Sequence, residues 1–428
     1  TDNRQGFNVR QSIEKHFWAH QTLTLRAFCR QFAPSRVPAM YYDVLRGAVA
    51  RDTLFDRFPD HAARAEAEAW HAELGVTPHR DVRERIEQAL GGAAEWVLIG
   101  GPPCQAYSVA GRSRNRGVAG YRPDQDERQY LYAEYLQIIT DHWPAMFVME
   151  NVKGLLSATV RQNRMFDLIR EDLADPARVS RLRTGSGRRH RYRVVPISGH
   201  GDRFADLDVE DYLVQAERHG IPQARHRVIL LGIRDDLATS WSPAKHRLGA
   251  AKETPACRVL ESLPALRSGL SSGGDSAESW LQVLGEARDR RWVKGARVSG
   301  GSDVQDLIAD TIDQLIVPRH DRGAEFIPGD FRTRFEPDWF YDGRIEGVCN
   351  HSTREHMPRD LHRYLYAACF AKCRAYSPKL RHFPPDLLPE HSNVQMALDG
   401  HGYFADRFRV QVEGRPATTI TSHIAKDG

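Results

Sequence analysis

The chain has 428 residues, of which 41% are hydrophobic and 27% charged, and its formal net charge at pH 7 is +4. This length exceeds what one hydrophobic core usually organises, so two or three domains are expected. No apolar run approaches the ~18 residues of a membrane helix and no signal peptide is visible, so we expect a cytoplasmic protein. Six cysteines do not make a disulfide framework in a chain of this length, which indicates a reducing compartment.

The first hundred residues are predicted to alternate between short strands and helices. The segment 7–13 alternates loosely and ends at Glu14, which is typical of a strand closed by an acid. The apolar run 96–99 predicts a buried strand that ends at Gly100. Helical spacing or composition predicts helices in three segments: 19–32, 62–74 and 81–90.

Strands and helices continue to alternate further along the chain. Strands are expected at 146–149 and 228–233, and helices at 129–143 and 165–173. This alternation predicts a doubly wound α/β domain that extends to about residue 240.

The composition changes after residue 240. Three prolines and the low-complexity run 268–274 indicate a linker and the entry to a second, irregular α+β domain. The clearest element predicted there is a helix at 360–376, which has apolar residues along one face.

One thiol stands just beyond a predicted strand. Pro102 and Pro103 stiffen the chain directly before Cys104, at the edge where open α/β sheets bind their ligands. A thiolate is a strong nucleophile for an electron-poor ring carbon. Because the ordinary cysteine pKa is ~8.5, the site must favour loss of the thiol proton or activate the substrate. Cys104 is therefore a candidate nucleophile, and the alternative is a buried, inert cysteine.

An acid and two arginines follow in later motifs. Glu150 comes directly after four apolar strand residues, so we expect it in a cleft, where burial would favour its protonated form. Asn151 can hold this loop through hydrogen bonds to the backbone. Arg225 and Arg227 lie two residues apart, and an extended segment would direct them to the same side. The alternatives are a helix-capping acid and a pair of surface arginines.

Two basic clusters indicate a polyanionic partner. Residues 178–193 contain seven arginines, one histidine and no acid, and residues 112–122 contain four arginines and no acid. Clusters of this kind can neutralise phosphates, and the alternative is a solvated loop.

Three of these motifs, in this order, resemble those of the cytosine-C5 DNA methyltransferases. They are Pro102-Pro103-Cys104-Gln105, Glu150-Asn151-Val152 and Gln223-x-Arg225-x-Arg227. The resemblance covers residues 7–235 well and 240–428 more loosely, where the stretches from Asn350 to His356 and from Pro416 are similar to those of large bacterial members. It implies a Rossmann-like methyltransferase domain, S-adenosylmethionine as cofactor, and double-stranded DNA from which a cytosine is flipped out.

The resemblance also implies the catalytic roles. Cys104 attacks C6 of the cytosine, Glu150 protonates N3, Arg227 contacts O2, and Arg225 supports the site. After methylation of C5, loss of the C5 proton expels Cys104. The DNA-binding residues implied are Gln105, Ser108, Arg112, Arg114, Arg116 and Asn151.

The resemblance implies single residues that bind the cofactor. Glu14 matches the acid that binds the ribose hydroxyls, Asp81 matches the acid that contacts adenine, and Pro103 and Leu131 match residues that pack near the cofactor. The family's Gly-rich first motif and its closing motifs are not found in residues 1–428. We therefore expect an internal fragment, impaired or inactive as it stands, of a longer, active protein.

The domains and partners predicted on this basis are as follows. Residues 1–240 form the catalytic domain without its first strand, 241–410 the target recognition domain, and 411–428 the start of the return to the catalytic domain. We expect a monomer without a metal, in a bacterial restriction-modification system. Whether a companion restriction endonuclease is its genetic partner is left open by the sequence.

Three other interpretations stay open. A tRNA cytosine-C5 methyltransferase would use the same chemistry, although the long segment 240–410 favours a DNA target. A non-catalytic DNA-binding subunit would explain the missing motifs but has no need of Cys104. A zinc site could draw on Cys349, His351, His356, Cys369 and Cys373, but no CxxC pair is present.

Overall fold

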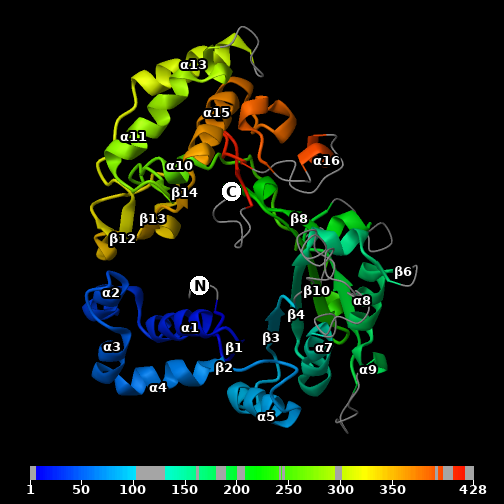
Figure 1. Ribbon diagram of the computed structural model, residues 1–428. Helices are drawn as coiled ribbons and strands as arrows, with labels where there is room; N and C mark the ends of the chain where they lie inside the picture. Colours follow the sequence, from blue (N-terminus) through cyan, green and yellow to red (C-terminus); the bar gives the residue numbers. More distant parts are fainter. Residues whose placement is uncertain are drawn as a thin grey trace. The chain divides into compact units, whose positions relative to one another are not determined.

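The chain forms two compact units (Figure 1). In this computed structural model, the residues described are 6–102, 131–160, 163–179, 189–199, 208–240, 242, 246–294, 301–390, 394–398 and 408–419. Unit 1 comprises 1–41, 49–215 and 226–250, and unit 2 comprises 42–48, 216–225 and 251–428. The functional assignment of the predicted domains, including a missing first strand, stays a prediction.

A central sheet organises unit 1. Its strand order is β3-β4-β10-β7, and β8 also pairs with β10. β3 and β4 are parallel, whereas β10 runs antiparallel to each of its neighbours. The mixed α/β architecture with a central sheet is therefore confirmed. The bounds are β3 Val97–Gly100, β4 Met146–Val152, β7 Tyr192–Val195, β8 Leu213–Gln215 and β10 His226–Arg234.

Apolar side chains cover both faces of this sheet. In β4, alternate residues are buried, so Phe147 and Met149 join the cluster that receives Ile139 of α7 and Phe166 of α8. Val148 points to the opposite face, into a second cluster with Ile233. The predicted helices 129–143 and 165–173 correspond to α7 Leu131–His142 and α8 Met165–Ala174.

The residue at position 232 on β10 must be small, because the ring of Phe147 on the neighbouring strand lies against it. A Cβ atom at this position would lie 2.1 Å from two ring carbons of Phe147. We expect Gly232→Ala to lower the free energy of unfolding by about 1–3 kcal/mol, the usual cost of overpacking a core. Urea unfolding measures this, with Gly249→Ala as the control because a Cβ there meets nothing within 4 Å. Equal stabilities of the two variants would contradict the prediction.

A separate two-stranded sheet lies near the start of the chain. β1 Ser12–Glu14 pairs in parallel with β2 Ala69–His71. The predicted strand 7–13 is thus shorter, and β2 was missed because its three residues follow an Ala/Glu-rich helical run without alternation. The connecting helices are α1 Phe17–Arg30, α2 Ala39–Leu45, α3 Arg51–Arg57 and α4 Pro59–Glu68.

The helix α5, His79–Leu90, connects β2 to β3. Its buried residues Val82 and Ile86 pack with Ile138 of α7, and Trp70 and Leu98 join the same cluster. The remaining short elements of unit 1 are β5 Thr159–Val160, β6 Asn163–Arg164 and α9 Pro176–Val179.

Helix α15 is the centre of unit 2. The predicted helix 360–376 is confirmed as α15 Pro358–Arg374, whose Tyr366 and Phe370 pack against Val304 and Ile308 of α13. The helices are α10 Cys257–Leu260, α11 Ala277–Gly285, α12 Arg291–Lys294, α13 Ser302–Asp313, α14 Pro337–Phe340, α15 and α16 Val394–Leu398. The strands are β9 Gln223–Ala224, β11 Gly269–Leu270, β12 Gly323–Pro328, β13 Gly347–Ser352, β14 Glu355–His356 and β15 Ala417–Thr418.

The Ser/Gly run 268–274 is not a linker. Gly269 and Leu270 are buried and form β11, which pairs in parallel with β14. A Cβ at Gly269 would lie 2.5 Å from the guanidinium carbon of Arg322, so a larger residue here would have to displace this guanidinium. The start of the run is therefore part of a sheet in unit 2, whereas residues 271–274 are exposed.

A buried histidine on α15 makes the stability of unit 2 depend on pH. Burial lowers the pKa of His362, and its Nε2 lies 2.6 Å from the carbonyl oxygen of Val283. Because the unfolded state takes up a proton near pH ~6.5 and the folded state takes it up only at lower pH, the free energy of unfolding falls as the pH drops below ~6.5. Urea unfolding at pH 7 and 5 should show this loss, and His362→Gln should reduce it. An unchanged pH slope in the variant would contradict the assignment.

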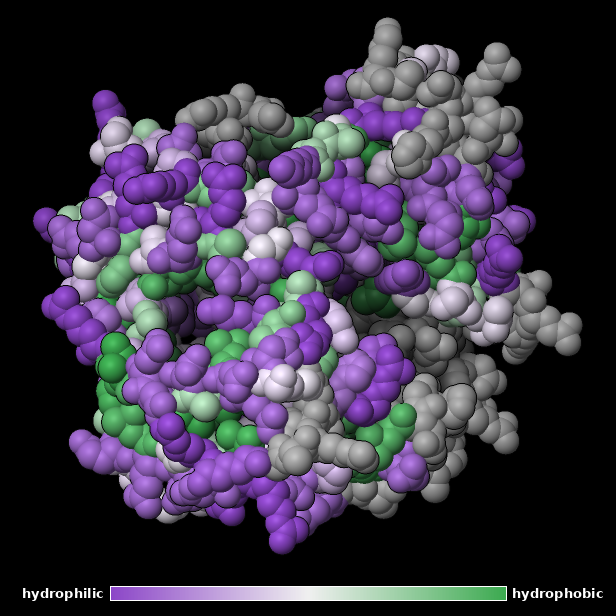
Figure 2. Space-filling model, turned by 90° about the horizontal axis from the view of Figure 1, so that it is seen from above, coloured by the Kyte–Doolittle hydropathy of each residue, from purple (hydrophilic) through white to green (hydrophobic). Residues whose placement is uncertain are grey.

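The surface is mainly polar on the face drawn in Figure 2, where hydrophobic residues gather only in smaller areas. Among the helices of the described residues, none combines the length and apolar character needed to cross a bilayer.

Candidate active site

Two of the predicted catalytic residues lie side by side on neighbouring strands. Arg227 Nε of β10 lies 2.7 Å from Glu150 Oε1 of β4, and the side chains are 21% and 41% exposed. Strand register explains the pair, because Arg227 stands opposite Val152 and thus diagonal to Glu150. The expectation that Glu150 is buried is wrong: alternation on β4 turns it to the face opposite Met149.

The loop that leads to Cys104 begins beside this ion pair. A Cβ at Gly101 would lie 3.2 Å from Glu150 Oε2, so the backbone passes close to the carboxylate. Cys104 follows three residues later in the sequence. It lies outside the described residues, as do Pro103, Gln105, Ser108, Arg112, Arg114 and Arg116.

Asn151 lies on the buried face of β4. It is 3% exposed, and its Oδ1 accepts a hydrogen bond from the backbone N–H of Val152 at 2.8 Å. This bond to the backbone was predicted from the sequence. Its burial favours a role in holding the end of β4 over direct contact with DNA.

The segment Gln223–Arg227 is not one straight strand. Arg225 lies between β9 and β10, and its N–H donates to the carbonyl oxygen of Gln223 at 2.9 Å, which is a three-residue turn. This turn precedes the pair, and the expectation that Arg225 and Arg227 share one side stays a prediction. β9 instead pairs in parallel with β15, which belongs to the stretch singled out from Pro416.

Two carboxylates mark the edge of the two-stranded sheet. Glu14 ends β1, and its Oε1 accepts a hydrogen bond from the N–H of His16 at 2.7 Å. Glu73 follows β2 by two residues, and its Oε1 lies 2.8 Å from Nζ of Lys15, the residue after Glu14. Because β1 and β2 are parallel, both acids stand at the carboxyl edge, where open sheets bind ligands.

Glu73 was not selected from the sequence, which favoured Asp81 instead. Asp81 lies in the first turn of α5 and pairs with the neighbouring Arg80, at a distance of 3.4 Å. Without β2, nothing in the sequence distinguished Glu73 from surface acids. Leu131, at the start of α7, lies near the loop after Glu73, since a Cβ at Gly75 would be 3.8 Å from its Cδ2.

Aromatic rings are exposed at the same edge. Phe17 and Trp18 begin α1, three and four residues after Glu14, and are 51% and 72% exposed. Their ring centroids lie 5.1 Å apart in an edge-to-face arrangement. The signal was visible as two adjacent large aromatics just beyond the predicted strand.

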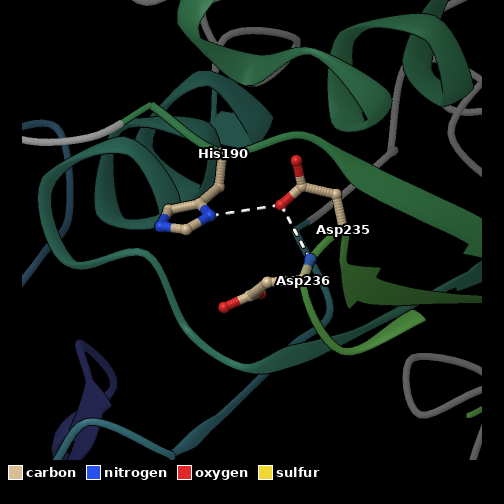
Figure 3. A group of neighbouring side chains, drawn as sticks. All are labelled: His190, Asp235 and Asp236. Carbon is tan, nitrogen blue, oxygen red and sulfur yellow. Dashed lines mark hydrogen bonds and ion pairs between the residues drawn. The ribbon is translucent and has the colours of Figure 1, made fainter. Parts of the chain in front are cut away.

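A histidine and two aspartates gather at the end of β10 (Figure 3). His190 Nδ1 lies 3.1 Å from Asp235 Oδ1, which also accepts the N–H of Asp236 at 3.0 Å. The carboxylate of Asp236 is engaged by Arg234 at 2.8 and 3.2 Å, and this hydrogen bonding lowers its pKa. These hydrogen bonds stabilise the backbone and side chains at the end of β10, which accounts for the grouping of the three residues.

The residues considered for zinc do not gather in the described part of the chain. Cys349 Sγ donates to the carbonyl oxygen of Leu45 at 3.3 Å, and His351 Nε2 lies 2.9 Å from that of Pro264. Cys369 is buried beside Thr311, with 3.8 Å between Sγ and Oγ1. Each of these groups is used in packing.

The match to a known protein family lies within unit 1. Residues 64–175 match the family model of the C-5 cytosine-specific DNA methylases. This segment contains β3, β4, Glu150 and Asn151. The resemblance to the cytosine-C5 DNA methyltransferases that the three motifs predicted is confirmed.

The chain is similar to three named methyltransferases. It is 27% identical over 285 residues to the type II methyltransferase M.Bpa9945I of Bacillus paralicheniformis, which covers 62% of this chain and 58% of that protein. It is 32% identical over 186 residues to the DNA (cytosine-5-)-methyltransferase M.ApeKI of Aeropyrum pernix, with coverages of 42% and 35%. It is 30% identical over 191 residues to the type II methyltransferase M.BbvI of Brevibacillus brevis, with 41% of each chain covered. The chain thus matches less than two thirds of the length of each relative.

Proposed function

We propose that this chain forms the catalytic centre of a DNA cytosine-C5 methyltransferase. The observation that carries the proposal is the placement of Glu150 against Arg227, 2.7 Å apart, with the approach to Cys104 beginning beside them at Gly101. A carboxyl group, a guanidinium and a thiol are the groups needed to activate a pyrimidine ring for attack at C6.

The chain's own residues would divide the chemistry. Cys104 Sγ forms a bond to C6 of a flipped cytosine while Glu150 supplies a proton to N3, so that negative charge does not accumulate on the ring. Arg227 is suited to donate to O2, and it also orients Glu150. After C5 has been methylated, a base removes the C5 proton and the Cys104–C6 bond breaks. Arg225 is proposed to support the site. Gln105, Ser108, Arg112, Arg114 and Arg116 are proposed to contact DNA.

The cofactor proposed is S-adenosylmethionine, which supplies the methyl group. The carboxyl edge of β1 and β2 fits an adenosyl group, because Glu14 can accept hydrogen bonds from ribose hydroxyls and Trp18 offers a ring face. Glu73 or Asp81 is the candidate for contact with adenine, and Leu131 and Pro103 the candidates for packing near it. Glu73 is the stronger of the two acids, because it stands at the same sheet edge as Glu14.

Duplex DNA is the proposed substrate in preference to tRNA. The relatives are named as DNA or type II methyltransferases, and such names support DNA for this chain. A non-catalytic DNA-binding subunit is disfavoured, since it would not require Glu150 and Arg227 to be held as a pair. A monomeric state is a further expectation.

The test is methyl transfer from labelled S-adenosylmethionine to duplex DNA and to tRNA, using the protein at its natural length and its Cys104→Ser variant. Label in DNA cytosine that is lost in the variant would support the proposal. A duplex containing 5-fluorocytosine should trap a covalent adduct, because fluorine at C5 cannot leave as a proton does. Label in tRNA alone, or DNA binding without label or adduct, would overturn it.

A further inference from the structure

A short segment near the start of the chain, flanked on both sides by residues of unit 1, belongs to unit 2. Residues Tyr42–Ala48 lie in the sequence between β1 and β2, yet they pack within unit 2. They include the end of α2. Tyr42 and Arg46 of this segment contact the connection between β12 and β13, residues 329–346, which we name the recognition loop.

Arg46 closes the last turn of the recognition loop. Its Nη1 donates to the carbonyl oxygens of Arg344 at 3.0 Å and Ile345 at 3.2 Å, and it lies 3.2 Å from Oε2 of Glu346. Arg344 and Ile345 end a 3-10 turn, Gly343–Ile345, and the last carbonyls of a helical turn take donors from outside it. An arginine is suited to this capping role because its fork presents several donors.

Tyr42 holds the start of the same turn. It is 5% exposed, and its hydroxyl donates to Asp342 Oδ2 at 3.3 Å. The guanidinium of Arg344 lies 4.9 Å from the centre of the Tyr42 ring. The turn is therefore fixed at both ends by residues from a distant part of the sequence.

The recognition loop presents aromatic rings to solvent. Trp339 is 74% exposed and Phe340 49%, while Arg332 lies 5.8 Å from the ring centre of Tyr341. The loop is closed at its base by the pairing of Pro328 with Gly347. Two of its non-glycine residues, Glu336 and Glu346, have φ angles of 42° and 57°, a strained conformation that persists only where the surroundings fix it.

We propose that the recognition loop contacts duplex DNA through Trp339 and Phe340, and that Arg46 and Tyr42 are positioning residues for it. This inference rests on the proposed function. Exposed rings next to arginines suit stacking on bases or wedging between them. The loop has five acids and three arginines, so contacts with bases and sugars are favoured over contacts with phosphates (acids: Asp330, Glu336, Asp338, Asp342, Glu346; arginines: Arg332, Arg334, Arg344).

The positioning role is tested without DNA or cofactor. Limited trypsin digestion of the unaltered chain, Arg46→Ala and the control Arg51→Ala should show cleavage after Arg334 and Arg344 at least ten times faster in Arg46→Ala alone. Arg51 is a suitable control because it pairs with its neighbour Asp52 on α3. Equal cleavage rates in the two variants, with equal thermal stability, would overturn the role of Arg46.

The DNA contact is tested by binding of unmethylated bacteriophage DNA fragments. We expect Trp339→Ala to bind at least tenfold more weakly, with an unchanged slope of log K against log salt, because no phosphate contact is lost. The control is Ile316→Ala in unit 2, which also removes an exposed apolar side chain, 78% exposed. Unchanged affinity of Trp339→Ala, or a reduced salt slope, would overturn the contact. Binding without methylation by the unaltered protein would overturn only the proposed function.

Discussion

Replacing Glu150 by glutamine is expected to lower the rate of methyl transfer by about 10²–10⁴-fold, the usual contribution of a general acid. Glutamine keeps the size and the hydrogen-bonding capacity of the side chain but has no carboxyl proton to give to N3. The measurement is kcat for label transfer to DNA under saturating substrate. The fold should persist, since the Glu150–Arg227 pair is partly exposed and such pairs add little stability.

Glu171→Gln is the matched control for this prediction. Glu171 is an exposed acid on α8, 60% exposed, within 3.9 Å of Arg178. A rate of Glu150→Gln within twofold of the control would remove Glu150 from the chemistry. Loss of DNA binding together with loss of rate would instead assign it to substrate binding.

Replacing Asp275 by alanine is expected to lower the free energy of unfolding of unit 2 by about 3 kcal/mol. The reason is that the buried guanidinium of Arg267 loses one of its two acidic partners. Arg267 has a side chain only 2% exposed, and its Nη1 lies 2.6 Å from Asp275 Oδ1. Asp275 also accepts the N–H of Leu270 at 3.2 Å and binds Arg322 at 2.7 Å. The variant leaves Arg267 with Asp321 as its remaining acidic partner.

Urea unfolding followed by circular dichroism measures this loss. Asp289→Ala is the control, because Asp289 pairs with Lys294 at the surface and both side chains are largely exposed. Surface pairs of this kind contribute little. A loss for Asp275→Ala no larger than for the control would show that Arg267 is stabilised by other groups.

The sequence by itself determined the main strands and the family resemblance. The apolar runs at β3, β4 and β10 are long enough to be read as strands, and α15 was visible from its apolar face. The motifs around Cys104, Glu150 and Arg227 predicted the chemistry, because a nucleophile, an acid and a cation in fixed order are a local property of the chain.

Only the tertiary structure decided which side chains meet. The 2.7 Å pair of Glu150 and Arg227 depends on the register between β4 and β10, which no local pattern gives. β2 is three residues long, so the position of Glu73 beside Glu14 became visible only through strand pairing. The Ser/Gly run predicts a linker, but Gly269 at its start pairs with Glu355 and lies beside Arg322. Arg46 likewise caps a turn about 300 residues away in sequence, a long-range contact that composition and periodicity do not encode.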